Sequence, residues 1–542
     1  MTKTNPKAGG SAKNLITQGS ILVASSFLVR LMNVFYRIPV TNLWGDRGLG
    51  TYGDAYQVYA FFLVFASISI PTTLSKLISE RMARGQSRGV TRVVRCAFAL
   101  VGGIGFVCMV IMMAFAEPIA IGMYHNPQAV LPIRFLGPTV FVVALMSVLR
   151  GYFQGLNDMT PTAVSEVIEG LLHAVFSVIL AYLLYNTAGL TWSVTGGILG
   201  TLTGAIGGIL FLAISYVIYK NRHSVNIDGS NAKDGIGSDG FESYRSIMKQ
   251  MLSLMVPIVL SSSAFSIKGI LDSAMFGTLM IRDGFSQEMA VAMRGIYTGK
   301  FVVLINLPIS IGDSFGAAAV PAVAGAYARK DREELKEQLR TIIKTTLIIA
   351  IPCAIGMMVL GKPFLKLMFP GSYLGGELFW VGGVSVVFYC LNYGASGVLS
   401  GLNKPQYPMY HVLLGVLASC ILNVITIRVL HLGIFSLALN STLFSLLLMV
   451  LNMRCAMKLC EVKVSVLKES LGPLGCALIM GLVCVAVYML SFAIAGSNAL
   501  STVLSVVCGV AAYFILLVNL KAATPGDLEK LPGGRYLEKL RF

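Results

Sequence analysis

Five basic residues lie inside long apolar stretches of this sequence, where a charge is costly. A Lys or Arg at the centre of a bilayer costs about 2.5–3.5 kcal/mol unless it faces a water-filled cavity or a partner. Cations kept at such positions indicate a cavity that attracts a phosphorylated or otherwise anionic substrate. The five are Arg30, Arg37, Lys76, Lys268 and Lys300.

Their spacing separates these cations into two groups. Arg30 and Arg37 are seven residues apart, so both project from one face of a helix. Aligning the two halves of the sequence places Lys268 opposite Arg30, and for these two we favour the cavity interpretation. Arg37 and Lys76 lie near the predicted ends of their helices, where snorkelling to the interface or pairing with an acid is an equal alternative.

Acidic residues inside the apolar stretches are fewer. Glu166, Glu169 and His173 share one stripe of a helix, which suggests a proton relay or a cation path. For Glu166, a hydrogen-bonded contact between helices is an equal alternative. Asp272 follows Lys268 by one helical turn, so an ion pair between them is a second interpretation.

The remaining polar residues indicate no enzymatic chemistry. Asn423 and Asn440 lie in apolar helices, where packing hydrogen bonds are the default interpretation. The five histidines are unclustered, and no P-loop, nucleophile elbow or metal motif is present. We therefore expect a non-enzyme without a cofactor or metal, driven by an ion gradient, the membrane potential or the substrate's own gradient.

The amino-acid composition indicates that much of this chain's surface faces lipid. Of its 542 residues, 56% are hydrophobic and 12% charged, about half the usual ~25% charged fraction of soluble domains. A single core stops growing near ~250–300 residues, so the apolar surplus must face lipid. The ten cysteines lie mostly in apolar runs without metal-type spacing, and we expect no disulfide framework.

Hydropathy predicts an all-α integral membrane protein with fourteen transmembrane helices, since each span needs ~20 apolar residues. The predicted spans are 17–41, 55–80, 92–116, 130–154, 161–186, 191–219, 250–280, 295–325, 340–361, 376–401, 406–431, 433–457, 471–495 and 499–520. The charged stretch at 331–344 is either an interfacial helix or a solvated start to the ninth span.

The distribution of charge tests this count independently. With the N-terminus inside, thirty of the 42 Lys and Arg residues fall in cytoplasmic segments, seven in outer segments and five within spans. The net charge of +17 is therefore a record of topology, and we expect no nucleic-acid partner. Both termini are predicted to be cytoplasmic.

An internal repeat organises the spans. Gly155-Leu156-Asn157 recurs as Gly401-Leu402-Asn403, and the segments after Pro71 and Pro321 have the same layout. Six spans per copy give both copies the same orientation, and transport sites commonly form at such repeat interfaces. We predict a first lobe at 1–219, a linker rich in Gly, Ser, Asn and Asp at 220–249, a second lobe at 250–457, and two further helices with a cytoplasmic tail at 458–542.

Three stretches resemble one transporter family. RLMNVFYRIPVTNLWGDRGLGTY (30–52), IPTTLSKLISERMARG (70–85) and RGYFQGLNDMTPTAVSEVIEG (150–170) are similar to the polysaccharide-transport branch of the multidrug/oligosaccharidyl-lipid/polysaccharide (MOP) exporter superfamily, among stage V sporulation protein B-like proteins and lipid II flippases. The resemblance implies a flippase of the bacterial cytoplasmic membrane, and we expect it to be a monomer. It would move undecaprenyl-pyrophosphate-linked saccharide, above all the peptidoglycan precursor lipid II, to the outer leaflet by alternating access for cell-wall synthesis.

The resemblance also implies roles for individual residues. Flippases place cationic cavity residues at the positions of Arg30, Arg37, Lys76 and Lys300, and a gating carboxylate at the position of Glu80. They can also carry a cation site joining the seventh, eleventh and twelfth helices. Asp272 and Asn423 match part of that site, so a coupling cation, Na+ or H+, is an open expectation.

Two other functions remain as alternatives. One is a cation-coupled multidrug exporter of the same fold, although such exporters usually bind cationic drugs in acidic cavities. The other is a non-transporting scaffold for envelope or spore assembly. The expected partners are the lipid-linked saccharide, membrane lipid and the cell-wall synthesis machinery.

Overall fold

A computed structural model describes residues 6–84, 86–227 and 242–520, and every regular element in these ranges is helical. Residues 228–241 of the predicted linker and 521–542 of the predicted tail lie outside the described residues. All ten cysteines lie in the described ranges, and each is free. This agrees with the expectation that the chain has no disulfide framework.

Twelve helical segments in the described ranges are long and apolar enough to cross a membrane. Two of them are double-length, Leu28–Ala83 with 56 residues and Thr160–Asn221 with 62. Each contains a glycine in a non-helical, left-handed conformation, Gly45 with φ 62° and Gly189 with φ 82°. Because a single crossing takes ~20 residues, each double-length segment holds two spans, and fourteen spans result.

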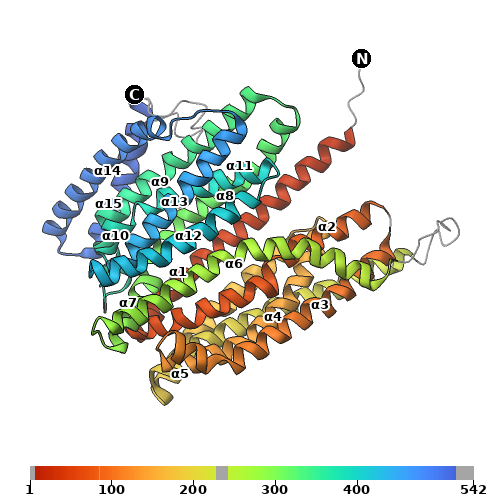
Figure 1. Cartoon of the computed structure of the whole chain (residues 1–542), viewed down its shortest axis with the longest axis horizontal. Helices are drawn as coiled ribbons and strands as arrows, with labels where there is room; N and C mark the ends of the chain where they lie inside the picture. The colour runs from red at the N-terminus through yellow and green to blue at the C-terminus, as the bar shows by residue number, and fades with distance from the viewer. Residues whose placement is uncertain (1–5, 85, 228–241, 521–542) are drawn as a thin grey trace. The chain divides into compact units, whose positions relative to one another are not determined.

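The chain divides into two compact units (Figure 1). The first takes its described residues from the ranges 1–44 and 51–270, and the second from Gly45–Gly50 and Leu271–Phe542. Helices of the first unit are α1 (Pro6–Leu63), α2 (Ile70–Ala83), α3 (Ser87–Ala114), α4 (Val130–Gly155), α5 (Thr160–Ile227) and most of α6 (Tyr244–Arg282). Within it, α4 packs against α2, α3 and α5.

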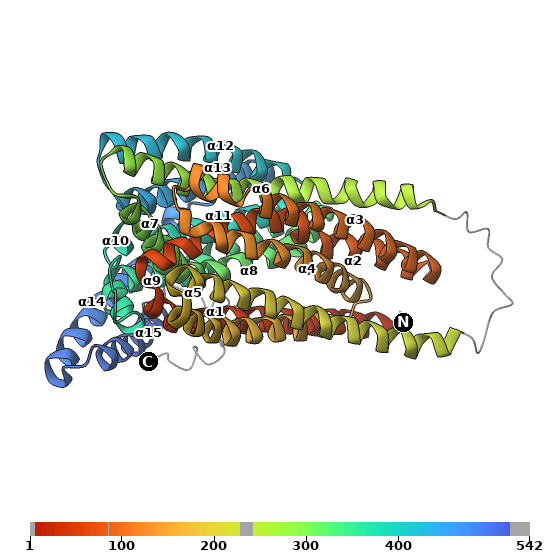
Figure 2. The same ribbon diagram turned by 90° about the horizontal axis from the view of Figure 1, so that it is seen from below.

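The second unit holds the remaining helices. They are α7 (Gln287–Gly295), α8 (Val302–Ala328), α9 (Arg332–Met368), α10 (Leu378–Gly382), α11 (Ser385–Gly401), α12 (Gln406–Val424), α13 (Phe435–Cys460), α14 (Val466–Ala495) and α15 (Asn498–Asn519). Here α11 packs against α8, α9 and α13. The last two helices, α14 and α15, lie side by side against α9, as both views show (Figures 1 and 2). The charged stretch from residue 332 is the continuous start of α9, so it is not a separate interfacial helix.

The two copies of the repeat share backbone landmarks. Asn157 and Asn403 both adopt left-handed φ, 59° and 58°, two residues after the last residue of α4 and of α11. In each copy a helix glycine lets a neighbour approach: a Cβ on Gly155 would lie 2.7 Å from Ile78 of α2, and one on Gly401 would lie 2.8 Å from the Val320 carbonyl of α8. The same sequence triplet therefore ends the same packed helix in both units.

Candidate functional site

In the first unit, Arg37 is held against an aromatic face. Its Cζ lies 4.6 Å from the ring centroid of Tyr52, which is 2% exposed and stacks between Trp44 and Tyr56 at 5.5 and 5.4 Å. The hydroxyl of Tyr36 lies 3.2 Å from that of Tyr52 and fixes the ring from the side. The guanidinium is thus oriented by a cation–π contact.

No ion pair joins Arg37 to an acid among the residues that the structure describes. Its Nη1 is buried, and no described residue offers it a hydrogen-bond partner. A π face attracts a cation but accepts none of the guanidinium's five N–H donors in the manner of a carboxylate. The arrangement therefore leaves a half-buried cation, with a buried Nη1 that has donor capacity for an anion.

The other predicted cavity residues of the first unit differ in exposure. Arg30, two turns before Arg37 on α1, is exposed, and so are Lys76 and Glu80 of α2. Within the described ranges these three side chains form no ion pair or hydrogen bond. Lys268 on α6 is 8% exposed and has an interaction partner.

The acidic stripe of α5 meets separate partners. Glu169 Oε2 accepts a hydrogen bond from Arg150 Nη2 at 2.7 Å. The His173 ring packs 4.8 Å from Tyr36, and its Nε2 lies 3.4 Å from Oγ1 of Thr201. A relay or cation path through Glu169 and His173 stays a prediction, since the stripe forms no continuous chain of hydrogen bonds in this structure.

Glu166 makes the contact between helices that the sequence analysis gave as its alternative. Its Oε2 accepts hydrogen bonds from the hydroxyls of Ser25 and Ser26 on α1, at 3.1 and 3.0 Å. Both donors are neutral, as expected for a helix-packing contact.

In the second unit, Lys300 is fully enclosed. It lies in the π-helical turn Ile296–Phe301, and its side chain is 0% exposed. Its Nζ lies 2.5 Å from Oδ1 of Asp46 and donates to the carbonyl oxygen and hydroxyl of Ser372 at 2.5 and 2.9 Å. Ser372 in turn donates to Oδ2 of Asp46 at 2.6 Å.

Two glycines permit this approach of the Gly45–Gly50 segment. A Cβ on Gly295 would lie 2.0 Å from the carbonyl oxygen of Asp46, and one on Gly50 would lie 2.0 Å from that of Val291. Lys300 therefore clamps the segment onto α7 and the following turn. Its predicted role in holding a pyrophosphate stays a prediction and requires the contact with Asp46 to open.

A second buried carboxylate of this unit, Asp272 on α6, accepts hydrogen bonds from three neutral side chains. Its Oδ1 accepts hydrogen bonds from Asn423 Nδ2 at 2.8 Å, Ser419 Oγ at 2.9 Å and Asn440 Nδ2 at 3.2 Å. Asn440 also donates to Asn423 Oδ1 at 2.8 Å. The exposed fractions are 7% for Asp272, 1% for Ser419 and 0% for both asparagines.

This cluster can hold a small hard cation or a proton. Carboxylate, amide and hydroxyl oxygens are the ligands that hard cations prefer. Turning an Asn amide about its last torsion exchanges a donor nitrogen for an acceptor oxygen, so the same side chains suit both the empty and the occupied state. No group of three or more His, Cys, Asp and Glu side chains that could hold a metal ion occurs among the described residues.

Sequence reasoning placed Asp272 and Asn423 together but missed two members. Asn440 was interpreted as a packing residue and Ser419 was not singled out. The spacing of Ser419 and Asn423, one turn apart on α12, was the available signal.

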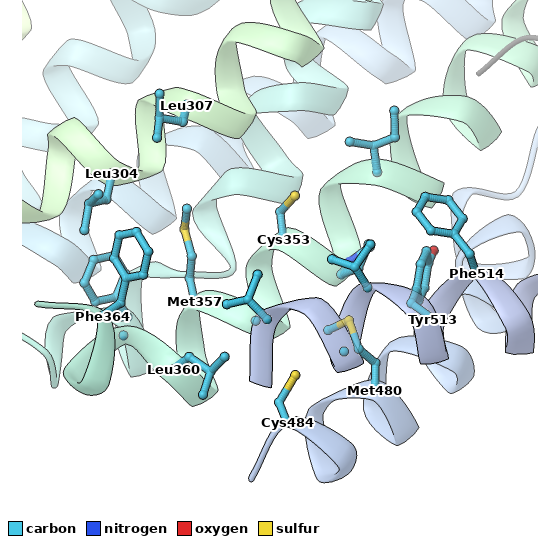
Figure 3. A pocket seen from close by; sticks show the side chains of 18 of the residues that line it. Leu304, Leu307, Cys353, Met357, Leu360, Phe364, Met480, Cys484, Tyr513 and Phe514 are labelled. Atoms are coloured by element: carbon cyan, nitrogen blue, oxygen red, sulfur yellow. The ribbon is translucent and has the colours of Figure 1, made fainter. Parts of the chain in front are cut away.

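An apolar groove of about 340 Å³ lies within the second unit (Figure 3). Side chains of α8, α9, α14 and α15 line it, among them Leu304, Met357, Phe364, Met480 and Phe514. The hydroxyl of Tyr513 donates to the Ile348 carbonyl at 2.7 Å, so this polar atom is satisfied by the protein. The groove suits a hydrocarbon chain.

Removing one partner of the enclosed ion pair tests its energetics. Lys300→Met leaves the Asp46 carboxylate buried without its cation, so it should lower stability by about 3–5 kcal/mol. Lys300→Met with Asp46→Leu should recover most of that loss. Thermal unfolding of the purified protein measures both, and equal melting temperatures for the single and double variants would contradict the account.

Two protein-family models and several known proteins match this chain. The model of a family described as "Polysaccharide biosynthesis protein" matches residues 15–326, and the MatE family model matches residues 257–425. Over 429 residues the chain is 25% identical to the lipid II flippase MurJ of Bacillus subtilis (strain 168), covering 76% of this chain and 77% of that protein. Over 526 residues it is 23% identical to stage V sporulation protein B of the same organism, covering 96% and 98%.

Solved structures share the fold. An inward-facing MATE family multidrug resistance transporter of the MOP superfamily aligns with a TM-score of 0.66 and 18% identity, over 80% of this chain and 98% of that one. Lipid II flippase MurJ in its inward closed conformation aligns with a TM-score of 0.65 and 16% identity, over 91% and 97%.

Proposed function

Because the chain belongs to the polysaccharide biosynthesis protein family of the MOP superfamily, and is a multi-pass membrane transporter, we propose that it flips a polyprenyl-pyrophosphate-linked saccharide. The proposed substrate is lipid II, moved from the inner to the outer leaflet by alternating access for cell-wall synthesis. The proposed setting is the bacterial cytoplasmic membrane, with both termini cytoplasmic and the protein monomeric.

The observation that carries this proposal is the uncompensated charge of Arg37. Nη1 is buried without a partner among the described residues, and the ring of Tyr52 holds the guanidinium in place. A planar, always-charged fork matches phosphate oxygens, and burial strengthens that attraction. A pyrophosphate supplies the anion that this site lacks.

Neighbouring charges extend the proposed site along the helices. Arg30 lies on the same face of α1 as Arg37, and Lys76 of α2 is exposed. We assign both to the approach of the pyrophosphate, with Glu80, one turn beyond Lys76, as a gating carboxylate. We also assign Lys268 and Lys300 to phosphate contacts along the proposed substrate path, and Lys300 has to leave Asp46 before it can make one.

The apolar groove supports the lipid half of the proposed substrate. A polyprenyl tail is a branched hydrocarbon, and burying it contributes about 25 cal/mol for each Å² removed from water. In a bilayer this gain is smaller, since lipid is also apolar, so the groove directs the tail more than it binds it. Leu304, Met357 and Phe514 are the contacts we assign to it.

Coupling to a cation is a proposal that rests on the Asp272 cluster. In this cluster one carboxylate has three polar neighbours, and the charge of the site rises by one when the carboxylate takes up Na+ or H+. Such a change of charge inside the membrane favours different conformations for the two states. The cation is a transported or coupling species here, not a resident cofactor.

Cation-coupled multidrug export is the second candidate, favoured by the MatE match to residues 257–425. Against it, the guanidinium held on Tyr52 in the first unit is positive, which repels cationic drugs. Export of a cationic dye by reconstituted protein, without movement of lipid II, would support this alternative.

Arg37→Ala should reduce lipid II translocation by about 10–100-fold, because hydrogen bonds to charged groups contribute about 1.5–3 kcal/mol. The measurement uses purified protein in vesicles containing lipid II, read by accessibility of the saccharide at the outer leaflet. Arg37→Lys keeps the charge without the fork and should be intermediate.

The matched control is Arg134→Ala, which removes an arginine of the same unit whose side chain is 46% exposed and lies 3.7 Å from Glu117. It should leave translocation unchanged. Translocation by Arg37→Ala at the rate of the Arg134→Ala control would refute the role of Arg37.

Asp272→Asn should abolish the dependence of translocation on a Na+ or H+ gradient, because an amide in place of the carboxylate neither takes up the proton nor attracts the cation. The initial rate is measured in vesicles with and without each imposed gradient. Asp283→Asn, which alters an acid directly after α6 that pairs with Arg428, is the control and should keep the dependence. A gradient effect that survives in Asp272→Asn would exclude this site from coupling.

A further inference from the structure

One contact between two helices of the second unit joins the Asp272 cluster to a histidine that the proposed function does not use. Every fourth residue of α12 from 411 to 423 forms one ridge, and every fourth residue of α13 from 440 to 452 forms another. The two ridges run antiparallel and pack together. The residues of this α12–α13 seam are His411, Gly415, Ser419 and Asn423 on α12, and Asn440, Phe444, Leu448 and Asn452 on α13.

Both ends of the seam are polar. At one end, Asn440 of α13 donates a hydrogen bond to Asn423 of α12 at 2.8 Å, within the Asp272 cluster. At the other end, Nδ1 of His411 lies 2.6 Å from Oδ1 of Asn452. The two ends are eight to twelve residues apart on each helix, so two to three helical turns separate them.

The middle of the seam is apolar and closed. A Cβ on Gly415 would lie 2.8 Å from the ring of Phe444 and 3.3 Å from Leu448. Phe444 is 2% exposed and Leu448 is 0% exposed. Because Gly415 has no side chain, turning the Phe444 ring aside would open a space that joins the two polar ends.

Hydrogen bonds fix which nitrogen of His411 carries its proton. Asn452 Nδ2 donates to Asn392 Oδ1 of α11 at 2.7 Å, and this orients the Asn452 amide. Its Oδ1 then accepts, so the neutral imidazole donates from Nδ1 and keeps a lone pair on Nε2. The His411 side chain is half-buried, and no described residue forms a hydrogen bond with Nε2. This nitrogen can therefore take up a proton.

The surroundings of His411 contain no competing acid. None of the described acids pairs with it, and behind Asn452 lie the neutral groups Asn392 and Ser396 of α11. The Tyr407 ring on α12 lies 6.4 Å away between centroids. Other titratable side chains on the adjoining turns are Lys404 and Tyr410 toward the start of α12, and Arg454, Cys455 and Lys458 on α13. Imidazole is the side chain best suited to exchange protons at physiological pH.

We propose that His411 is a second proton-binding residue of this seam, through which the coupling proton passes between the Asp272 cluster and the cytoplasmic side. The inference rests on the proposed coupling at Asp272 and narrows the cation to H+. The proposed topology places the start of α12 in the cytoplasm. With the Phe444 ring turned aside, water in the seam gives a proton to the Nε2 lone pair. The N–H bond formed there breaks again when the imidazolium returns a proton to cytoplasmic water.

The chemistry of the two ends favours H+ over Na+. Na+ is a hard cation that prefers oxygen ligands, and an imidazole nitrogen is not one of them. A carboxylate and an imidazole can both carry a proton, and chains of such groups inside a membrane protein form proton relays. The proton is therefore the species that both ends of the seam can hold.

Translocation of lipid II by the purified full chain in vesicles tests the role of His411. The initial rate is measured with and without an imposed pH gradient, with equal Na+ on both sides. The gradient should raise the wild-type rate. His411→Gln keeps an amide N–H for Asn452 but carries no proton on a ring nitrogen, so it should reduce the stimulated part of the rate at least about tenfold.

His431→Gln is the matched control. It makes the same substitution at a histidine of the same unit that also has a hydrogen-bond partner, Asp283 at 3.2 Å, but lies outside the seam with 70% of its side chain exposed. This variant should keep the stimulation by the pH gradient.

A second measurement needs no lipid II. Phe444→Leu opens the middle of the seam, so an imposed pH gradient should decay faster in vesicles that hold this variant than in wild-type vesicles. Adding His411→Gln to Phe444→Leu should return the decay to the wild-type rate. A pH-sensitive dye inside the vesicles reads the decay.

The outcomes separate this inference from the proposed function. Stimulation that His411→Gln keeps would overturn the inference alone, and so would a wild type that responds to a Na+ gradient but to no pH gradient. A wild type that moves no lipid II would contradict the proposed function. In that case the decay decides the inference: faster decay in Phe444→Leu that His411→Gln removes supports it, and unchanged decay overturns it.

Discussion

A charge inside a bilayer is costly unless a partner compensates it. The two units differ in how far they supply that partner to a cation. Lys300 of the second unit is enclosed completely, and Asp46 and Ser372 together supply a carboxylate, a carbonyl and a hydroxyl. Arg37 of the first unit has an aromatic ring for support and a buried nitrogen without a partner among the described residues. The first arrangement stabilises a fold, whereas the second leaves capacity for a ligand.

The same requirement governs the anions. Glu169 pairs with Arg150, while Asp272 accepts three hydrogen bonds from neutral donors on α12 and α13. Neutral donors lower the cost of burying a carboxylate without cancelling its charge. A carboxylate beside two amides and a hydroxyl offers the oxygen ligands that a hard cation prefers, and for this reason the proposed coupling site lies at Asp272 and not at Glu169.

The spans were predictable because hydropathy and length constrain a membrane helix strongly. All fourteen follow from the sequence, including the two pairs that continue through Gly45 and Gly189. The resemblance to MOP exporters was also correct, since family models and solved folds agree with it. Helix ends were less predictable. For example, α9 begins at Arg332, whereas the predicted ninth span begins at residue 340.

The partners of the charged residues were beyond the sequence. Arg37 and Tyr52 are fifteen residues apart, about 22 Å along a straight helix, and the break at Gly45 is what brings them into contact. Asp46 and Ser372 are 326 positions apart, so no local sequence pattern predicts that both contact Lys300. Spacing along one helix predicts a shared face, but it does not predict which distant helix meets that face.

The central claim is that the uncompensated cation of the first unit recognises the phosphates of a lipid-linked saccharide. The most direct measurement is equilibrium binding of lipid II to the purified protein, compared with an analogue that carries the same polyprenyl chain and saccharide joined without phosphate. The account predicts that the wild type binds lipid II at least tenfold more tightly than the analogue, and that Arg37→Ala loses most of this difference. Equal affinity of the wild type for both molecules would contradict it.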